Sequence, residues 1–505
     1  MSTSHKKPIP LPAQQVAIEQ RLLERIRTLG TEPPLPQRVF VNRALRLGSI
    51  DVIGFDLDWT LADYDRLPME QLAFDLTRRR LVNSHGYPEL VLDAEFRPDF
   101  PRRGLLIDKQ TGAIVKMNRH HYVGRAFIGR RKLPAQERNR LFRREPIHPD
   151  DDRFYRADTL FELPELNLFA ELVELASHGK LEVESYEQLF LDIRSSIDEI
   201  HRDGTLKERI LANLSHYLPK DPDLILSLER LRLSGRKLLL LTNSEWFYTK
   251  ALCEHLFNGV LSCVQDWRQL FDLVVCRTRK PLFFREENPF VEIDQHGKKL
   301  GECPVPSFGR VYEGGNRSGL MKLLNCPGER VLYVGDHIYG DVMASKQQGT
   351  WRTALIVREL EDELEARAGL EHDYRHLETL KYEIAAMGHR MDSVGDEIDL
   401  YQELAEAGVD FDAKQIEAAR QEHSSLETQH KALRLLAASR QERISHSYNT
   451  LWGSLFKQGS NKSLFGAQVD DFACIYTSRV RNLLAYGCGH YFRVLRDPMM
   501  HETQL

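Results

Sequence analysis

The stretch Val52-Ile-Gly-Phe-Asp56-Leu-Asp58-Trp-Thr60-Leu-Ala62 is the strongest structural signal in this 505-residue chain. Its apolar start predicts a strand that ends in two carboxylates. Positions i and i+2 of a strand share a face, so Asp56 and Asp58 would enter one pocket at the edge where open α/β sheets bind ligands. Close carboxylates repel unless a cation lies between them, which indicates a hard metal ion such as Mg²⁺. A solvated acidic pair is the alternative interpretation.

The overall composition is that of a soluble globular protein, with 42% hydrophobic and 28% charged residues and a net charge of -5. This balance predicts no general attraction to nucleic acid or anionic membranes. Seven cysteines without a Cys-x-x-Cys pair argue against a zinc site or a disulfide framework and favour a reducing, cytoplasmic location. The sequence has no apolar export signal and no apolar run of membrane-spanning length, so we expect neither export nor insertion.

Strands and helices alternate regularly after Pro222, which predicts a doubly wound parallel sheet covered on both faces. Residues 67–207 lack this alternation and are expected to form an inserted cap. From Leu377 to His446, apolar residues at 3-4 spacing on both sides of Ala407-Gly408 predict an antiparallel helical hairpin. The predicted parts are an N-terminal tail and helix (1–36), a discontinuous α/β core (37–66 and 208–358), the cap (67–207), the hairpin (359–446) and a segment that packs on the core (447–505).

Polar side chains follow four of the predicted core strands. They are Asp56, Asp58 and Thr60 after the first, Thr242 and Asn243 after the second, Lys280 after the third, and Asp336 and Asp341 after the fourth. A helix cap, a loop lysine or a turn would explain each group alone. A doubly wound sheet would bring all four groups to one edge, which favours a shared site.

These residue types suit phosphoryl transfer. Asp56 ends its strand and is the expected nucleophile, forming an aspartyl-phosphate, with Asp58 as general acid and base. Thr242, Asn243 and Lys280 are expected to hold the phosphoryl oxygens. Mg²⁺ would be bound by Asp56, Asp58 and Asp336. Asp341 is expected to support these ligands from behind.

In this order, Asp-x-Asp-x-Thr, a strand-end Thr, an isolated Lys and Gly-Asp-x(4)-Asp resemble the haloacid dehalogenase superfamily of phosphohydrolases. Longer stretches are similar to the type II cytosolic purine 5′-nucleotidases, which prefer IMP and GMP. These stretches are 55–62, 242–244, 279–284, 335–341, 351–353, 453–456 and 464–468. The resemblance implies Mg²⁺-dependent hydrolysis of purine nucleoside monophosphates and their deoxy forms, phosphoryl transfer to a nucleoside as a second activity, and a homotetramer.

The resemblance assigns base and ribose binding to the cap. The residues it implies are Phe161, Arg194, Asp198, His201 and Lys207. Arg194, Asp198 and His201 are spaced to lie on one helix face. Arginine can donate to the 6-oxo and N7 edge of a purine, and a carboxylate can accept the N1 proton that adenine lacks. Glu162 stands where the family has an amide, and a surface ion-pair helix is the alternative for this segment.

Family members are activated by nucleoside polyphosphates at a separate site, so the resemblance also implies an effector. Arg144, Tyr339 and Gln468 fit that site. The residues that depart from it are Arg156, Asp158, Asp471 and Phe472. We hypothesise a guanine-nucleotide effector such as GTP, whose phosphates would be held by a basic run within residues 125–144. A solvated basic face is the alternative for this run.

Three other functions compete with nucleotide hydrolysis. The first is a phosphatase of the same superfamily that acts on another phosphomonoester, and base preference would separate the two. The second is a catalytically silent nucleotide sensor, which has no need of the nucleophile Asp56. The third is a helical scaffold built on the hairpin, which leaves the four strand-end groups unexplained.

Overall fold

The computed structural model describes residues 32–142, 147–347, 349–410 and 412–494. The helix expected near residues 14–29 and the proposed effector residue Arg144 lie outside these ranges. The described chain forms two compact units. One contains residues up to Glu361 together with those from Asn461 onward, and the other is Asp362–Ser460.

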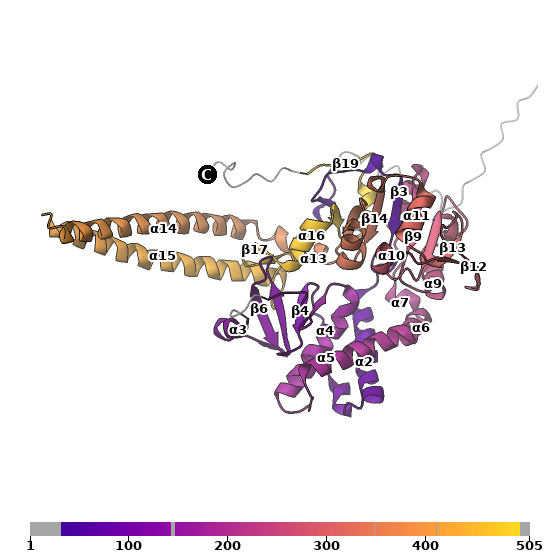
Figure 1. Ribbon diagram of the computed structural model, residues 1–505, viewed down its shortest axis with the longest axis horizontal. Helices are drawn as coiled ribbons and strands as arrows, with labels where there is room; N and C mark the ends of the chain where they lie inside the picture. Colours follow the sequence, from indigo (N-terminus) through magenta and orange to yellow (C-terminus); the bar gives the residue numbers. More distant parts are fainter. Residues whose placement is uncertain (1–31, 143–146, 348, 411, 495–505) are drawn as a thin grey trace, which may run out of the picture. The chain divides into compact units, whose positions relative to one another are not determined.

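The first unit is built on a ten-stranded sheet with the order β1-β18-β15-β14-β3-β9-β10-β13-β11-β12, seen partly edge-on in Figure 1. Neighbours from β18 to β13 run parallel, whereas β1, β11 and β12 join antiparallel at the two edges. The strands are β1 (Phe40–Val41), β3 (Val52–Phe55), β9 (Lys237–Leu241), β10 (Leu273–Cys276), β11 (Phe290–Ile293), β12 (Lys299–Cys303), β13 (Val311–Gly314), β14 (Val331–Gly335), β15 (Arg352–Ile356) and β18 (Ile475–Thr477).

Both faces of this sheet are buried, which explains why its strands read as continuous apolar runs. Along β3, Ile53 and Phe55 join one apolar cluster and Val52 joins the other. Helices α8 (Pro222–Leu233) and α9 (Trp246–Phe257) cover the first face. Helix α11 (Arg317–Leu324) covers the second. The predicted doubly wound α/β core is confirmed.

Strand β3 is the point where the strand order reverses, because β9 follows on one side and β14 lies on the other. Ligands of open α/β sheets bind outside the carboxyl ends of the strands at such a switch point. The residues that follow β3, β9, β10 and β14 are those singled out from the sequence. The topology therefore brings the four polar groups to one edge.

The segment between β3 and α8 contains the inserted cap. Helix α2 (Arg66–His85) packs on α4 (Leu163–Ser177) and α5 (Tyr186–Arg202). Beside them lies an antiparallel sheet with the order β7-β6-β5-β4-β8. Its strands are β4 (Leu105–Asp108), β5 (Ala113–Met117), β6 (Val123–Ile128), β7 (Arg131–Lys132) and β8 (Phe154–Ala157).

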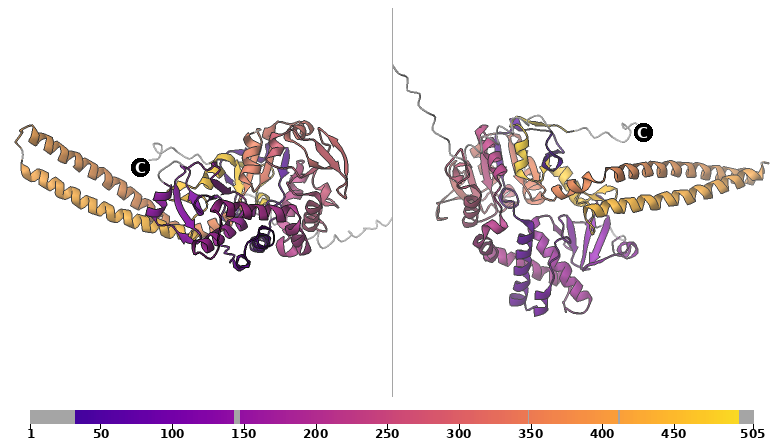
Figure 2. Two further views of the ribbon diagram at one scale, coloured as in Figure 1. Left: turned by 60° about the horizontal axis from the view of Figure 1, so that its bottom comes forward. Right: turned by 180° about the vertical axis from the view of Figure 1, so that it is seen from behind.

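The second unit contains the predicted helical hairpin, formed by α14 (Glu371–Glu406) and α15 (Ala413–Tyr448), each 36 residues long. The two helices lie side by side in every view of Figures 1 and 2. Leu377, Leu380, Val394, Ala419 and Ile444 are their buried positions. Among the described residues, no helix has the length and apolarity needed to cross a membrane.

Two parts of the sheet differ from the sequence prediction. Residues 285–315 contain β11, β12 and β13, which the sequence analysis did not identify. Strand β18, after the hairpin, returns to pair with β1 and β15. These strands are short and lie at or near the sheet edges, so they lack the long apolar runs that identify the central strands.

Candidate active site

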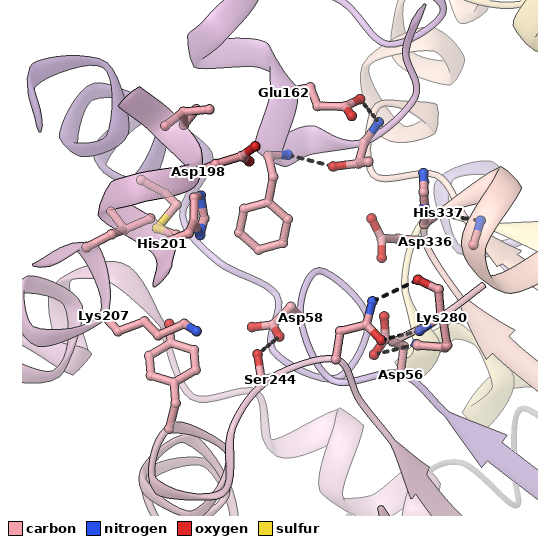
Figure 3. A pocket seen from close by; sticks show the side chains of 18 of the residues that line it. Asp56, Asp58, Glu162, Asp198, His201, Lys207, Ser244, Lys280, Asp336 and His337 are labelled. Atoms are coloured by element: carbon pink, nitrogen blue, oxygen red, sulfur yellow. Dashed lines mark hydrogen bonds and ion pairs between the residues drawn. The ribbon is translucent and has the colours of Figure 1, made fainter. Parts of the chain in front are cut away.

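A pocket of about 360 Å³ lies at the carboxyl ends of β3, β9 and β14 and is closed on its other side by the cap. Figure 3 shows Asp56, Lys280 and Asp336 on one side and Asp198, His201 and Lys207 on the other. The predicted site residues that line it are Asp56, Asp58, Phe161, Arg194, Asp198, His201, Lys207, Asn243, Lys280, Asp336 and Asp341. Ser244, Tyr248, His337 and Glu162 also line it.

Lys280 is the buried cation at the core end of the pocket. Its Nζ lies 2.9 Å from Asp56 Oδ1 and 2.8 Å from Asp341 Oδ1, and it donates to the Tyr333 hydroxyl at 2.8 Å. Burial opposes its charge, but the carboxylates of Asp341 and Asp56 prevail and raise the pKa of Lys280 well above its usual value. Lys280 therefore stays charged and can offset negative charge at this end.

Asp56, Asp336 and Asp341 each offer a carboxylate oxygen within 4.8 Å of the others. Burial, with a smaller contribution from the neighbouring carboxylates, raises the pKa of Asp56 to about 7 and that of Asp336 well above its usual value. A bound cation would remove this repulsion. An all-oxygen carboxylate set suits a hard ion such as Mg²⁺, so the residues present fit the predicted metal.

The carboxylates grouped here differ from the predicted set of metal ligands. Asp341, expected behind the ligands, joins Asp56 and Asp336 directly. The Asp58 carboxylate is not part of this group, and two hydroxyls donate to it: Tyr64 to Oδ1 and Ser244 to Oδ2, each at 2.6 Å. This arrangement leaves Asp58 available for proton transfer rather than for carboxylate ligation.

Thr242 and Asn243 shape the loop after β9. The Thr242 hydroxyl is fully buried, accepts the Ser244 N–H at 3.0 Å and is not among the lining residues. Asn243 lines the pocket, and its Oδ1 accepts the Lys280 N–H at 2.7 Å and the Thr278 hydroxyl at 2.8 Å. These bonds fix the position of Lys280. The expected direct role of Thr242 on the phosphoryl oxygens is not reflected in this geometry.

Arg103 supports the loop that follows β14 and was not found from the sequence. Its buried guanidinium binds Glu359 through two hydrogen bonds of 2.8 and 2.5 Å and donates to the Asp336 carbonyl at 2.9 Å. Arg103 comes from the cap, whereas Glu359 follows β15 and Asp336 follows β14. No local motif marks such a contact.

The cap end of the pocket is organised around Arg194 on α5. Its Nη1 donates to the Tyr155 hydroxyl at 2.7 Å and to Glu165 at 2.8 Å, while Nη2 lies 3.0 Å from Asp198. Since Nε and one hydrogen of Nη2 are uncommitted in these bonds, the guanidinium can still donate to a ligand. The predicted pair of Arg194 and Asp198 therefore lies in the pocket. Arg194 is held there by the buried Glu165, which the helical spacing of α5 could not reveal.

The other predicted contacts at the cap end are aromatic and basic. The Phe161 ring meets the His201 ring edge-on, with 5.7 Å between centroids. Burial, with the nearby charges of Lys207 and Arg194, lowers the pKa of His201 to about 4, so this imidazole is neutral near pH 7. Lys207 forms an ion pair with Glu245. A nucleotide would have to share Lys207 with Glu245.

Glu162 stands where the type II cytosolic purine 5′-nucleotidases have an amide, and it has a structural role. Its carboxylate accepts the N–H groups of Asp158 (2.7 Å) and Thr159 (3.1 Å) and the Tyr155 hydroxyl (2.7 Å). The Thr159 side chain completes a capping box. The Thr-x-x-Glu motif is a sequence signature of a helix N-terminus, so this role of Glu162 could have been predicted from the sequence. Its bonds hold Glu162 beside the base end, where it adds negative charge near Arg194.

Two of the residues assigned to an effector, Tyr339 and Gln468, lie in the described chain on elements that pack together. Tyr339 accepts a hydrogen bond from Arg285 at 3.0 Å. Gln468 lies on α16 (Leu464–Phe472), which packs against the short helix η7 (Ile338–Met343) that carries Tyr339. In the basic run, Arg130 pairs with Glu171 and Arg131 with Glu137. These two arginines are therefore committed to acidic neighbours.

The chain is similar to known proteins along most of its length. A family model described as "5' nucleotidase family" matches residues 39–504. A 5′-nucleotidase domain-containing protein of Dictyostelium discoideum is 28% identical over 497 residues, covering 97% of this chain and 79% of its own. The 5′-nucleotidase domain-containing protein 2 of Homo sapiens is 28% identical over 485 residues, covering 93% and 86%.

Two solved structures are also similar to this chain. One is described as a predicted phosphoglycolate phosphatase from Haemophilus somnus, at 14% identity and a TM-score of 0.27, covering 61% of this chain and 86% of its own. The other is a HAD phosphatase from Thermococcus onnurineus, at 15% identity and a TM-score of 0.24, covering 61% and 87%.

Proposed function

Since this chain belongs to the 5′ nucleotidase family, we propose that it hydrolyses 6-oxopurine nucleoside 5′-monophosphates, IMP and GMP and their deoxy forms, with Mg²⁺. The observation that supports this most directly is the pocket itself. Its core end gathers Asp56, Lys280 and Asp336, and its cap end gathers Arg194 and Asp198. One end suits a phosphate and the other suits a polar base.

At the core end, Asp56 attacks the phosphorus atom as the bond to the 5′ oxygen breaks, giving an aspartyl-phosphate. Asp58 gives a proton to the departing 5′ oxygen, and the nucleoside leaves. Water then attacks the phosphorus while Asp58 takes its proton, and the Asp56 carboxylate is released with inorganic phosphate. A nucleoside hydroxyl in place of this water would give phosphotransfer.

Charge at this end is offset by the chain's own lysine and would be offset further by a bound metal ion. Lys280, between Asp56 and Asp341, offsets charge on the phosphoryl oxygens. Mg²⁺ held by Asp56, Asp336 and Asp341 would relieve the repulsion between their carboxylates and the phosphate.

At the cap end, Arg194 would donate to the 6-oxo and N7 edge, and Asp198 would accept the N1 proton of hypoxanthine or guanine. Adenine has no N1 proton for Asp198 and presents an amine instead of an acceptor at position 6, so each group would lose one hydrogen bond to the base. Phe161 offers a face for the base, with neutral His201 beside it.

The test is phosphate release from IMP, GMP, AMP and CMP with and without Mg²⁺. Release from IMP and GMP at least about tenfold faster than from AMP, and only with Mg²⁺, is the expected result. Equal rates on all four, or release only from a different phosphomonoester, would overturn the purine assignment. No release from any phosphomonoester would favour a nucleotide sensor.

The proposal extends to regulation, assembly and location. Activation by GTP is expected from the packing of α16 on η7, which brings together the segments that carry Gln468 and Tyr339. The same assay with added GTP tests it, and an unchanged rate would remove the effector.

A cytoplasmic homotetramer is proposed from the family resemblance. The mass of the protein in solution, measured by light scattering, tests the assembly.

A further inference from the structure

The two oxygens of the Asp58 carboxylate have different surroundings. Oδ1 accepts the phenol O–H of Tyr64, which is 3% exposed and is not among the residues that line the pocket. Oδ2 accepts the hydroxyl of Ser244, which does line the pocket, as Figure 3 shows. Both bonds are 2.6 Å long. One oxygen therefore faces a fixed buried donor, and the other faces a rotatable hydroxyl at the pocket wall.

A tight turn brings Tyr64 back to Asp58. The N–H groups of Leu61 and Ala62 both donate to the Leu57 carbonyl, at 2.9 and 2.8 Å. Trp59 adopts a φ of 55°, which is uncommon for a bulky residue. Its ring packs edge-on against the Tyr64 ring, with centroids 5.2 Å apart. The turn and this ring contact together fix the Tyr64 side chain.

Tyr248 gives the hydrogen-bond chain its direction. Tyr64 has one hydroxyl proton, which it donates to Asp58, so in the 2.9 Å contact between the two phenols Tyr248 is the donor. Burial and the charge of Asp58 raise the pKa of both phenols above their usual value. Both phenols therefore stay protonated, and the chain runs from Tyr248 through Tyr64 to Asp58.

From this geometry we propose that Tyr64 is a positioning residue for proton transfer by Asp58, and that the transferred proton is carried on Asp58 Oδ2. Tyr64 holds Oδ1 as an acceptor, which leaves Oδ2 as the oxygen that is protonated at the pocket wall, with the rotatable Ser244 hydroxyl turned to accept from it. This proton passes to the ester oxygen as the P–O bond breaks, and Tyr64 stabilises the carboxylate that forms. In the second step Oδ2 takes a proton from the attacking water. The inference rests on the proposed phosphomonoester hydrolysis.

The test compares two leaving groups in Tyr64→Phe, with the full chain and Mg²⁺. The alkoxide of IMP needs a proton to leave, whereas p-nitrophenolate leaves as a stable anion. Because the variant loses one hydrogen bond to a charged group, we expect kcat/KM for IMP to fall about 10- to 100-fold. For p-nitrophenyl phosphate we expect a change of less than about threefold. Equal losses on both substrates, or no loss on either, would overturn the proposal.

A matched control removes an equivalent phenol elsewhere. Tyr374 and Tyr448 in the helical hairpin form a hydroxyl–hydroxyl contact of 2.7 Å, so Tyr374→Phe should leave both substrates unaffected. If Tyr64→Phe does not fold, Ser244→Ala, which removes the hydroxyl partner of Oδ2, is expected to show the same selective loss on IMP. Equal losses there would also overturn the proposal.

The two readouts separate this proposal from the proposed function. The rate of the wild type on IMP tests the proposed function. The role of Tyr64 is tested by the ratio of kcat/KM in the variant to that in the wild type, compared between IMP and p-nitrophenyl phosphate. If the wild type prefers another alkyl phosphomonoester, that ester replaces IMP and the ratio has the same meaning.

Discussion

The Lys280 ion pairs in the core half of the pocket and the Arg194–Asp198 pair in the cap half have similar lengths but very different exposure. In the core, the side chains of Lys280 and Asp341 are 2% exposed and that of Asp56 is 14% exposed. In the cap, Arg194 is 34% and Asp198 is 53% exposed. The distances within these pairs are 2.8, 2.9 and 3.0 Å.

Exposure decides what such a pair does. A pair open to water contributes little to stability and can exchange its partner for a ligand. A buried pair is costly to break, because the remaining charge has no water around it. The core half is therefore suited to hold a fixed arrangement for chemistry, and the cap half is suited to open and select a base.

The largest effect is expected from Asp56→Asn in the core. If the chemistry depends on this carboxylate, turnover should fall by about 10⁴-fold or more, because an amide does not attack phosphorus. The protein should remain folded, since the substitution removes a buried charge next to Asp336 and Asp341. Phosphate release and thermal unfolding measure the two effects. Normal turnover would remove Asp56 as the nucleophile.

Lys280→Met should affect both chemistry and folding. It leaves Asp56 and Asp341 buried without their cation, so we expect a stability loss of about 3–5 kcal/mol in metal-free buffer. Turnover should fall about 100- to 1,000-fold, because one charged group on the phosphoryl oxygens is lost. Unfolding with and without Mg²⁺ is the measurement, and Mg²⁺ should stabilise the variant more than the wild type. Equal stabilisation would mean that Lys280 and the metal do not share these carboxylates.

In the cap, Arg194→Met should change selection more than chemistry. We expect KM for IMP and GMP to rise about tenfold or more, with little change in kcat, because a purine-edge contact of this kind contributes about 1–3 kcal/mol. The variant also leaves Glu165 buried without its partner. The double variant Arg194→Met/Glu165→Gln should regain stability but keep the high KM. A fall in kcat with unchanged KM would break the division between the two halves.

The core half could be predicted from the sequence because its side chains directly follow buried strands. Asp56 comes after β3, Asn243 after β9 and Asp336 after β14, and a strand end fixes where the next residues lie. Arg103 escaped prediction because its partner Glu359 is 256 residues away in the sequence. Tyr64 is close to Asp58 in the sequence, but the turn that returns it to this carboxylate is irregular, and its second partner Tyr248 is 184 residues away. Their neighbours in the chain carry no pattern that reports such contacts.

In the cap, helical spacing predicted that Arg194, Asp198 and His201 share a face, and all three line the pocket. Spacing could not reveal Glu165 and Tyr155, because they reach Arg194 from α4 and β8. A helix pattern reports which residues lie together on one helix. It does not report what packs against them.

The smallest effect on turnover is expected for a pair of buried glutamates that extends the comparison beyond the pocket. Glu70 on α2 of the cap is 1% exposed, and within the described chain neither of its oxygens has a hydrogen-bond donor; Arg66 Nε lies 3.4 Å away. Glu229 on α8 of the core is 3% exposed and accepts bonds from the Ser262 N–H and hydroxyl and the Cys263 N–H. The two sites differ in hydrogen bonding rather than in burial.

Burial raises the pKa of Glu70 from 4.5 to about 7. Between these two pH values the folded protein keeps a proton on Glu70 that the unfolded chain releases. The free energy of unfolding is therefore unaffected by Glu70 below about pH 4.5 and falls by up to about 3 kcal/mol as the pH rises through 7. Glu70→Gln mimics the neutral acid, so urea unfolding should show it to be more stable than the wild type at about pH 8 and equal to it at about pH 4.5. Glu229→Gln should instead destabilise by about 1–3 kcal/mol near pH 7, because an amide nitrogen cannot accept the bonds made there. If Glu70→Gln destabilises the protein at about pH 8, Glu70 is ionised and held by Arg66. The cap would then stabilise a buried carboxylate through a bonded partner, as the core does.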